Sequence, residues 1–211
     1  HRRLVESALV LLAVLAAPPA HALNKLVNWG FETGGSWLLF SELPDTNTEV
    51  LFERVAGGVN GSAMAFEGSW VGTGNTPGST HRGLQQTYTP AANVRALLRG
   101  HYRRTKSGSG NPASYRFRLM AFIGTTAQFT AIDLTTSAND SNWASDDQSA
   151  TLTGGSTYRI EARWDIQTNQ NATVGAKVDA IQLHTSPAGV AAAAVAGSTN
   201  VQLTWSASTG D

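Results

Sequence analysis

The sequence contains no cysteine among its 211 residues, so the fold has neither disulfides nor a thiolate metal site. Charged residues are also scarce, at 14% of the chain, and 15 basic residues balance 15 acidic ones. Because a surface that binds nucleic acid shows as an excess of basic residues, we expect no nucleic-acid partner. The chain must hold together by burying apolar surface, helped at most by a hard cation bound through oxygen atoms.

Long apolar runs are missing after the first twenty residues. Near the start, Arg2 and Arg3 precede an apolar run over residues 8–17, and Ala20-His21-Ala22 follows. A basic segment, a ten-residue apolar core and an Ala-x-Ala site are typical of a secretory signal, and the run is shorter than the ~20 residues that span a bilayer. We therefore predict a signal-peptide helix over residues 1–22 and a secreted or cell-surface protein without a membrane partner after cleavage. An amphipathic or buried helix is the alternative.

Motifs of common enzyme classes are missing as well. The sequence has no G-x-S-x-G, H-E-x-x-H, P-loop or dinucleotide-binding motif, and its five histidines lack the spacing of metal ligands. Glu161 and Asp165 share one face of a predicted strand, which is too little to indicate a hydrolase with paired carboxylates. We predict that this chain is not an enzyme, and we keep a small hydrolase or lyase on the same fold as an alternative.

Short alternating segments, glycine and small polar residues are what the sequence has in abundance. Over residues 157–166, Tyr158, Ile160, Ala162, Trp164 and Ile166 alternate with polar residues, and this period of two predicts a half-buried antiparallel strand. Similar segments cover 94–104, 115–124, 129–134 and 174–183. Eight to ten strands at this spacing predict an all-β fold, a two-sheet antiparallel β-sandwich (jelly roll) over residues 23–186.

The composition changes beyond Ser186. Pro187 opens an Ala-rich segment, and Val201-Gln202-Leu203-Thr204-Trp205 follows a turn at residues 197–200. A Pro boundary followed by V-x-L-x-W resembles the start of a fibronectin type III domain. Such a sandwich has about 100 residues, so residues 187–211 would be a linker and its truncated start. An Ala-rich linker alone is the alternative.

The segment Val27-Asn28-Trp29-Gly30-Phe31-Glu32-Thr33-Gly34-Gly35 resembles the first strand of jelly-roll carbohydrate-binding modules, which are attached to bacterial xylanases and endoglucanases and have a galactose-binding-like sandwich. Those modules begin N-x-x-F-E, followed by glycines and a Trp, which is Trp37 here. Their last strand carries an Asp, matched by Asp179, although Ala180 stands where the family often has a second Asp. Trp143, before a Thr-rich stretch, also fits. The resemblance covers residues 23 to about 185.

This resemblance implies a structural Ca²⁺ ion. In the family the first and last strands lie side by side, and the two acids bind the cation together with backbone carbonyls. The metal candidates are Glu32 and Asp179, with Asn28 and Glu67 as weaker additions. Calcium suits such a set because it takes six to eight oxygen ligands. The alternative is that both acids are solvated or hydrogen-bonded at a strand end.

The resemblance also implies a polysaccharide or glycan partner. The protein would be a non-catalytic, secreted, monomeric module that targets a larger bacterial multidomain protein to the glycan, as an accessory to a hydrolase whose catalytic domain lies elsewhere. A structural or adhesive extracellular β-sandwich without sugar binding is the alternative. Trp164 is predicted to lie in the core, and Trp29, Trp37 and Trp143 are predicted to pack.

Trp70 is the predicted exposed aromatic of the glycan site, because it precedes a Gly-rich loop; a Trp that only covers the sandwich end is the alternative. The predicted polar strand faces add Arg99, His101, Arg103, Arg116, Arg118, Glu161 and Arg163. If these strands are neighbours, they form one charged face; an ordinary solvated sheet face is the alternative, and the one we favour. The many arginines and few aromatics favour an acidic glycan or a protein partner over a neutral cellulose-type glycan.

Overall fold

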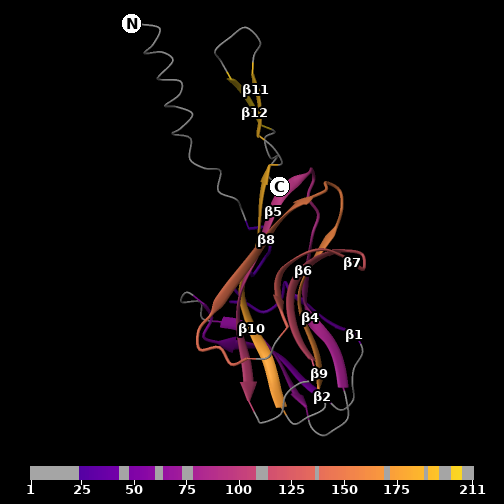
Figure 1. Cartoon of the computed structure of the whole chain (residues 1–211), viewed down its shortest axis with the longest axis vertical. Coiled ribbons are helices and arrows are strands. Elements are labelled where there is room, and N and C mark those ends of the chain that lie inside the picture. The colour runs from indigo at the N-terminus through magenta and orange to yellow at the C-terminus, as the bar shows by residue number, and fades with distance from the viewer. Residues whose placement is uncertain are drawn as a thin grey trace, which may run out of the picture.

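The computed structural model describes residues 24–42, 48–59, 64–72, 78–107, 114–135, 138–168, 172–187, 190–194 and 201–205. These residues form strands and turns (Figure 1), and the predicted signal peptide lies outside them. The strands are β1 (Leu38–Glu42), β2 (Thr48–Ala56), β3 (Met64–Gly72), β4 (Gly78–Tyr88), β5 (Val94–Ser107), β6 (Ser114–Ile123), β7 (Thr126–Leu134), β8 (Ala144–Leu152), β9 (Tyr158–Thr168), β10 (Ala172–Pro187), β11 (Val190–Ala194) and β12 (Val201–Trp205).

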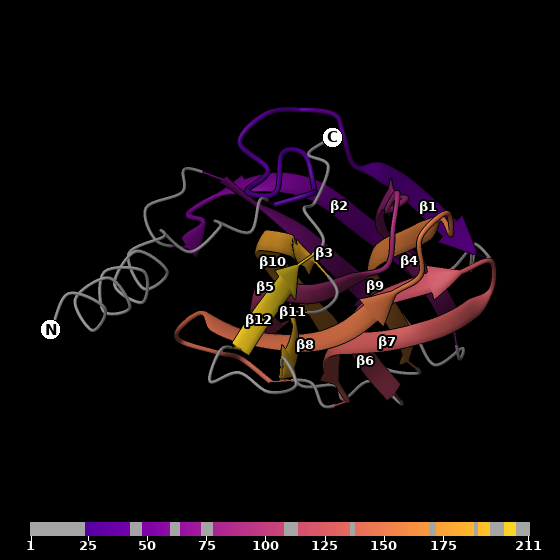
Figure 2. The same cartoon turned by 90° about the horizontal axis from the view of Figure 1, so that it is seen from above.

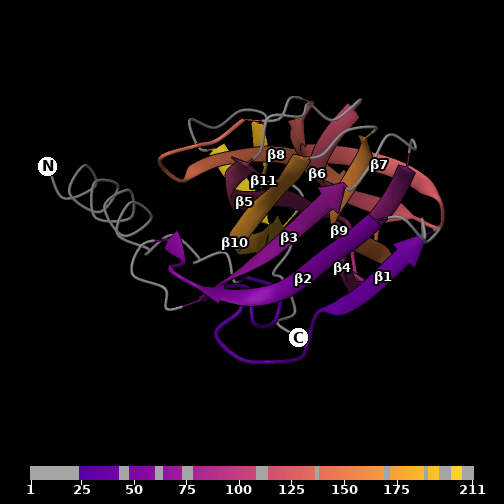
Figure 3. The same ribbon diagram turned by 90° about the horizontal axis from the view of Figure 1, so that it is seen from below.

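Ten of these strands form two antiparallel sheets of five. The β9 sheet has the order β1-β4-β9-β6-β7, and the β10 sheet has the order β2-β3-β10-β5-β8. Figure 1 shows β5, β8 and β10 on one side of the molecule and β4, β6 and β7 on the other, while Figure 3 shows β10, β3 and β2 in succession. The edge strands β7 and β8 are long and curved where the two sheets meet (Figure 2). The predicted all-β sandwich is confirmed.

The core lies between the two sheets and is built by alternating residues. In β9, Tyr158, Ile160, Ala162 and Trp164 are all buried, as their period of two predicts. The indole of Trp164 packs at 4.8 Å between ring centroids on Phe117 of β6. The buried core cluster also includes Leu84, Ala96, Leu98, Leu119, Ala121, Ile132, Leu152, Val174, Ala176, Val178, Ile181 and Leu183.

Two β-bulges interrupt the β6–β7 pair. The register shifts between Leu119 and Met120 and again between Ala121 and Phe122, and each shift places the extra residue on β7. A bulge adds an unpaired residue, and the consecutive β7 residues Ala131 and Ile132 are both buried. The pairing of β6 with β9 has no shift, so Met120 and Phe122 stay on the same side of the sheet as Arg116 and Arg118, although both are buried there.

The N-terminal segment closes one corner of the sandwich. Asn24 pairs with His184 of β10, Lys25 N donates to Leu183 O (2.9 Å), and Ile181 N donates to Trp29 O (3.0 Å). The expected adjacency of first segment and last strand is therefore confirmed. The expected strand itself is wrong, because residues 27–30 form a turn.

The turn continues into a loop that fills the end of the core. Phe31 and Trp37 are buried with ring centroids 5.5 Å apart, and Phe31 also packs on Phe66 of β3 at 5.7 Å. Trp29 is 41% exposed, so the prediction that it packs is wrong. Trp29 contacts β10 through its backbone carbonyl, which accepts the hydrogen bond from Ile181 N.

Among the strands that the structure describes, β11 and β12 pair only with each other, from Val190↔Trp205 to Ala194↔Val201. This hairpin is compatible with a fibronectin-like start, and the assignment stays a prediction. Within the described residues, no helix has the length and apolar character needed to cross a membrane.

Candidate functional site

The outward side of the β9 sheet brings together four of the predicted glycan-binding residues. Arg116 pairs in register with Asp165, Arg118 with Arg163, and Met120 with Glu161. Since their strand neighbours Phe117, Leu119, Ala162 and Trp164 point into the core, these side chains point away from it. We call this surface the β9 face; it comprises Phe40, Gly83, Arg116, Arg118, Met120, Phe122, Asp133, Arg159, Glu161, Arg163 and Asp165.

Asp165 is the centre of an ion-pair network on the β9 face. Arg118 Nε donates to Asp165 Oδ2 at 2.9 Å, and Arg118 Nη2 donates to the same oxygen. Arg163 Nε donates to Asp165 Oδ1 at 2.6 Å. Asp165 is only 8% exposed, and both its oxygens are held by guanidinium groups. Each guanidinium is therefore fixed in place by a buried carboxylate.

Arg116 extends the network to the edge strand β7. Its Nε and Nη2 donate to Asp133 Oδ1 and Oδ2 at 2.7 and 2.6 Å, a bidentate pair. The hydrogen bond from Arg116 holds the pKa of Asp133 below its usual value, and the same bond raises the pKa of Arg116. Both side chains are partly exposed, so this pair orders the surface more than it stabilises the fold.

Glu161 and Arg159 form the other end of the β9 face. Arg159 Nε lies 2.5 Å from Glu161 Oε1, and the Arg159 guanidinium also stacks over the Phe122 ring, 5.4 Å from its centroid. Glu161 is 1% exposed. Two acids of the face, Glu161 and Asp165, are therefore buried, whereas Arg116 and Asp133 are exposed, so the face is solvated only in part.

Phe40 is a residue of this face that the sequence did not single out. It pairs with Gly83 of β4, which in turn pairs with Arg163. A Cβ built on Gly83 would lie 2.7 Å from Phe40 Cε1 and 2.2 Å from Ala162 O, so only glycine permits this approach. The half-buried Phe40 ring therefore packs against the backbone of Gly83, with Cε1 and Cζ nearest, beside the ion-pair network. A glycine opposite an aromatic in adjacent strands could have indicated this contact.

The other predicted polar residues lie on the opposite sheet. Arg99, His101 and Arg103 belong to β5 and point outward from the β10 sheet, so the strands do not form one charged face with β6 and β9. Arg103 Nε donates to Asp140 O at 3.0 Å. Burial, and secondarily the charge of Arg99, lowers the pKa of His101. The backbone of Trp70 pairs with Val174 of β10, and its side chain lies outside the described residues.

Asp179 and Glu32 meet at the turn of the N-terminal segment. A Cβ on Gly30 would lie 3.8 Å from both Asp179 Oδ1 and Glu32 Oε1, so the two carboxylates converge on this glycine. Asp179 is fully buried and accepts hydrogen bonds from Val59 N (2.7 Å, to Oδ2) and Ala180 N (2.6 Å, to Oδ1). Within the part of the chain that the structure describes, neither acid has a basic side-chain partner.

The electrostatics of this acid pair suit a hard cation. Desolvation, with a smaller contribution from the charge of Glu32, raises the pKa of Asp179 to about 6. A cation would offset both effects, and carboxylates with nearby backbone carbonyls are ligands that Ca²⁺ prefers. The two carboxylates could supply part of the ligand set of a calcium ion. Among the described residues, no three acidic or histidine side chains are grouped closely enough to bind a metal ion together.

Asn28 has a different structural role. With φ at 49°, it accepts a hydrogen bond from Thr33 N (3.1 Å) and donates from Nδ2 to Thr33 O (2.7 Å) and Gly35 O (3.2 Å). Its side chain therefore shapes the loop that carries Glu32. The fourth candidate, Glu67, faces Lys177 at 3.8 Å. The calcium site of Glu32, Asp179 and Asn28 stays a prediction.

The two acids that the sequence analysis considered for a hydrolase, Glu161 and Asp165, lie far apart along β9. Glu161 and Asp165 are four residues apart on one strand, so their Cα atoms are about 13 Å apart at ~3.3 Å per residue. The two carboxyl groups of a glycosidase are about 5–9.5 Å apart. In addition, both acids are held by arginines.

Comparison of the sequence with protein-family models gives no match, and comparison with curated proteins gives none either. Solved structures with a similar fold include a family 61 carbohydrate-binding module in complex with β-1,4-galactotriose. It shares 16% identity and has a TM-score of 0.47, and the match covers 78% of this chain and 99% of that one.

A xylan-binding domain of family 22 from Paenibacillus barcinonensis is also similar, at 16% identity and a TM-score of 0.43 over 76% of this chain and 93% of that one. A third is the enzymatically active domain of tailspike protein 4 from bacteriophage CBA120, at 12% identity and a TM-score of 0.46 over 77% of this chain. The match spans 21% of the tailspike chain. With TM-scores below 0.5, these similarities carry no argument about function.

Proposed function

We propose that this chain is a non-catalytic carbohydrate-binding module and that its glycan site is the β9 face. The observation that supports this most is the network around Asp165, in which Arg118 and Arg163 are fixed by a buried carboxylate beside the flat Phe40 ring. Sugar recognition needs placed hydrogen-bond groups and a flat apolar surface. Groups that are already ordered lose little conformational entropy on binding.

The pairing of the arginines favours a neutral glycan over an acidic one. Each of Arg116, Arg118, Arg159 and Arg163 is ion-paired to an acid of the same face. Their charge is therefore largely neutralised, while N–H groups that the acids do not use can donate to sugar hydroxyls. This reverses the preference for an acidic ligand that the arginine content suggested.

The remaining parts of the proposal rest on the sequence. The module is secreted through the signal at residues 1–22 and targets a larger extracellular bacterial protein to the glycan. A following fibronectin-like domain begins at about residue 187. Calcium bound by Glu32 and Asp179 holds the N-terminal loop against β10 and contributes stability rather than sugar contacts, because these residues lie at the β10 sheet and not on the β9 face.

The experiment is a glycan array and polysaccharide pull-down of residues 23–186, with neutral and uronate-containing polymers, in calcium and in EDTA. The test variants are Phe40→Ala and Arg116→Gln, which change exposed or half-buried groups of the β9 face. The matched control is Arg99→Gln on the opposite sheet. We expect both test variants to weaken binding to a neutral polymer while the control binds as the parent does.

Two results would contradict the proposal. If folded parent protein binds no glycan, the chain is a structural or adhesive sandwich. If binding survives both β9-face variants and is lost in Trp70→Ala, the site lies at the end of β3. Circular dichroism of each variant shows whether the loss reflects unfolding.

A further inference from the structure

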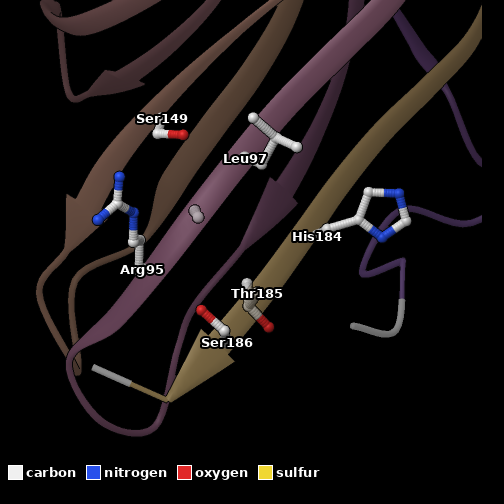
Figure 4. A pocket seen from close by; sticks show the side chains of 7 residues that line it. Arg95, Leu97, Ser149, His184, Thr185 and Ser186 are labelled. Atoms are coloured by element: carbon white, nitrogen blue, oxygen red, sulfur yellow. The ribbon is translucent and has the colours of Figure 1, made fainter. Parts of the chain in front are cut away.

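A small pocket lies on the outward side of the β10 sheet, away from the β9 face. It has a volume of about 160 Å³ and lies where β5, β8 and β10 run side by side. Its floor is Leu97, which pairs with Ser149 of β8 and with His184 of β10. Arg95 is two residues earlier on β5 and pairs with Ser186. Figure 4 shows Arg95 and Ser149 on one side of β5 and Thr185 and Ser186 on the other.

The polar groups of this pocket have one sign of charge. Arg95 contributes a permanent positive charge, and Ser149 and Ser186 contribute hydroxyl groups. Thr185 also lines the pocket, but it pairs with the core residue Ala96, so its side chain belongs to the other side of the sheet. None of the residues that line the pocket carries a carboxylate. His184 also lines the pocket, but in Figure 4 its ring lies on the far side of β10 from Arg95, and its Nε2 lies 3.2 Å from Gln182 Oε1.

Arg95 differs from the arginines of the β9 face. Among the residues that the structure describes, its side chain makes no hydrogen bond or ion pair, and this side chain is exposed. Each arginine of the β9 face is paired with an acid instead. The guanidinium of Arg95 therefore keeps its fork of donors available for an anion, and such forks bind oxyanions in bidentate fashion.

The volume limits what can bind. A water molecule occupies about 30 Å³ of the liquid, so the pocket holds on the order of five waters. That is enough for one oxyanion group and far below the ~300–1,000 Å³ of pockets for larger ligands. A sugar chain could place one acidic substituent there and leave its ring outside.

We infer that this pocket binds a single small oxyanion, held by the Arg95 guanidinium and the hydroxyls of Ser149 and Ser186. The oxyanion is either a free inorganic ion or the carboxylate or sulfate of an acidic sugar. This site is separate from the proposed glycan site, because it lies on the other sheet and takes an anion, whereas the β9 face is proposed to take a neutral glycan.

The test is a nuclear magnetic resonance titration of the parent protein with sulfate, methyl glucuronide and, as the neutral control, methyl glucoside, at constant ionic strength set by chloride. We expect saturable shifts centred on residues 95–97, 149 and 186 with an oxyanion and none with the neutral sugar. Shifts with sulfate alone assign an inorganic ion, and shifts with methyl glucuronide assign a sugar acid.

Variants distinguish a specific oxyanion site from non-specific attraction of anions to a positively charged surface. Arg95→Gln should weaken oxyanion binding roughly tenfold or more, since it removes a charge-assisted contact. Arg95→Lys should bind with intermediate affinity. Arg99→Gln, on the same strand and face but outside the pocket, should bind as the parent does. No saturable shift with any oxyanion, or equal losses in Arg95→Gln and Arg99→Gln, would overturn the inference whatever the β9 face binds.

Discussion

The buried carboxylate of Asp179 predicts that the calcium-free protein becomes less stable as pH rises from about 4 to about 6. In the folded chain the pKa of this group is raised from 3.8 to about 6. Between these values the native state binds more protons than the unfolded state, so the free energy of unfolding falls with increasing pH. A difference of about two units corresponds to on the order of 3 kcal/mol, lost in full above pH 6.

The assay is urea denaturation in EDTA across this pH range for the parent and for Asp179→Asn. The amide has no charge to desolvate, but its nitrogen cannot accept the second of the two backbone N–H bonds from Val59 and Ala180. The variant should therefore lose about 1–3 kcal/mol at low pH and little more as pH rises. Comparing the two proteins removes the contribution of His101, whose lowered pKa acts in the opposite direction.

We expect the stability advantage of the parent over Asp179→Asn to shrink by about 3 kcal/mol between pH 4 and pH 7, which for a domain of this size is roughly 6–12 °C in Tm. Saturating calcium should abolish this decline in the parent, because the cation favours the ionised carboxylate. An advantage that stays constant with pH in EDTA would refute the reasoning about Asp179.

Three further predictions concern stability measured by urea denaturation. Gly83→Ala should cost about 3 kcal/mol or more, because its Cβ would meet backbone at 2.2 Å; near-parent stability would mean that Phe40 does not pack there. Gly100→Ala should cost about 1–3 kcal/mol, less than Gly83→Ala, since its nearest contact is a movable side-chain methyl at 2.8 Å. Arg54→Ala removes the guanidinium that donates to the carbonyls of Phe31 and Glu32, each at 2.8 Å, and should cost about 1–2 kcal/mol. An unchanged urea midpoint would show that these two hydrogen bonds do not stabilise the loop.

Local patterns in the sequence predicted β5, β6, β7, β9 and β10, but they gave no strand over β1, β2 or β4. The alternation in β9 predicted that Trp164 is buried, and the same period predicted the core side of β5. Period two reports only the side of the sheet on which a residue lies, so it could not show that Met120 and Phe122 are buried on the outward side, where Arg159 stacks over Phe122. The burial of Glu161 also escaped prediction, because it depends on where the Arg159 side chain lies.

Local patterns in the sequence could not predict the order of the strands within the two sheets. Arg99 and Arg163 have the same polar-face signature, yet they lie on different sheets. Strand order is set by contacts between residues far apart in the chain, and one sequence does not show them. For the same reason Phe40 was missed: its importance depends on Gly83, more than forty residues away.

The corner where Asn24 pairs with His184 also determines how the sandwich would respond to force. The described sandwich begins at this corner and its last strand ends three residues further on, at Pro187. Tension applied through the flanking chain would act first on the few hydrogen bonds between Asn24, Lys25 and Leu183. These bonds would open one after another, because the two antiparallel segments are pulled apart from their adjacent ends. The end of β10 is also paired with β5, at Ser186↔Arg95 and Pro187↔Val94, so this edge of the β10 sheet would share the load. The β9 sheet would carry little load until that corner had opened.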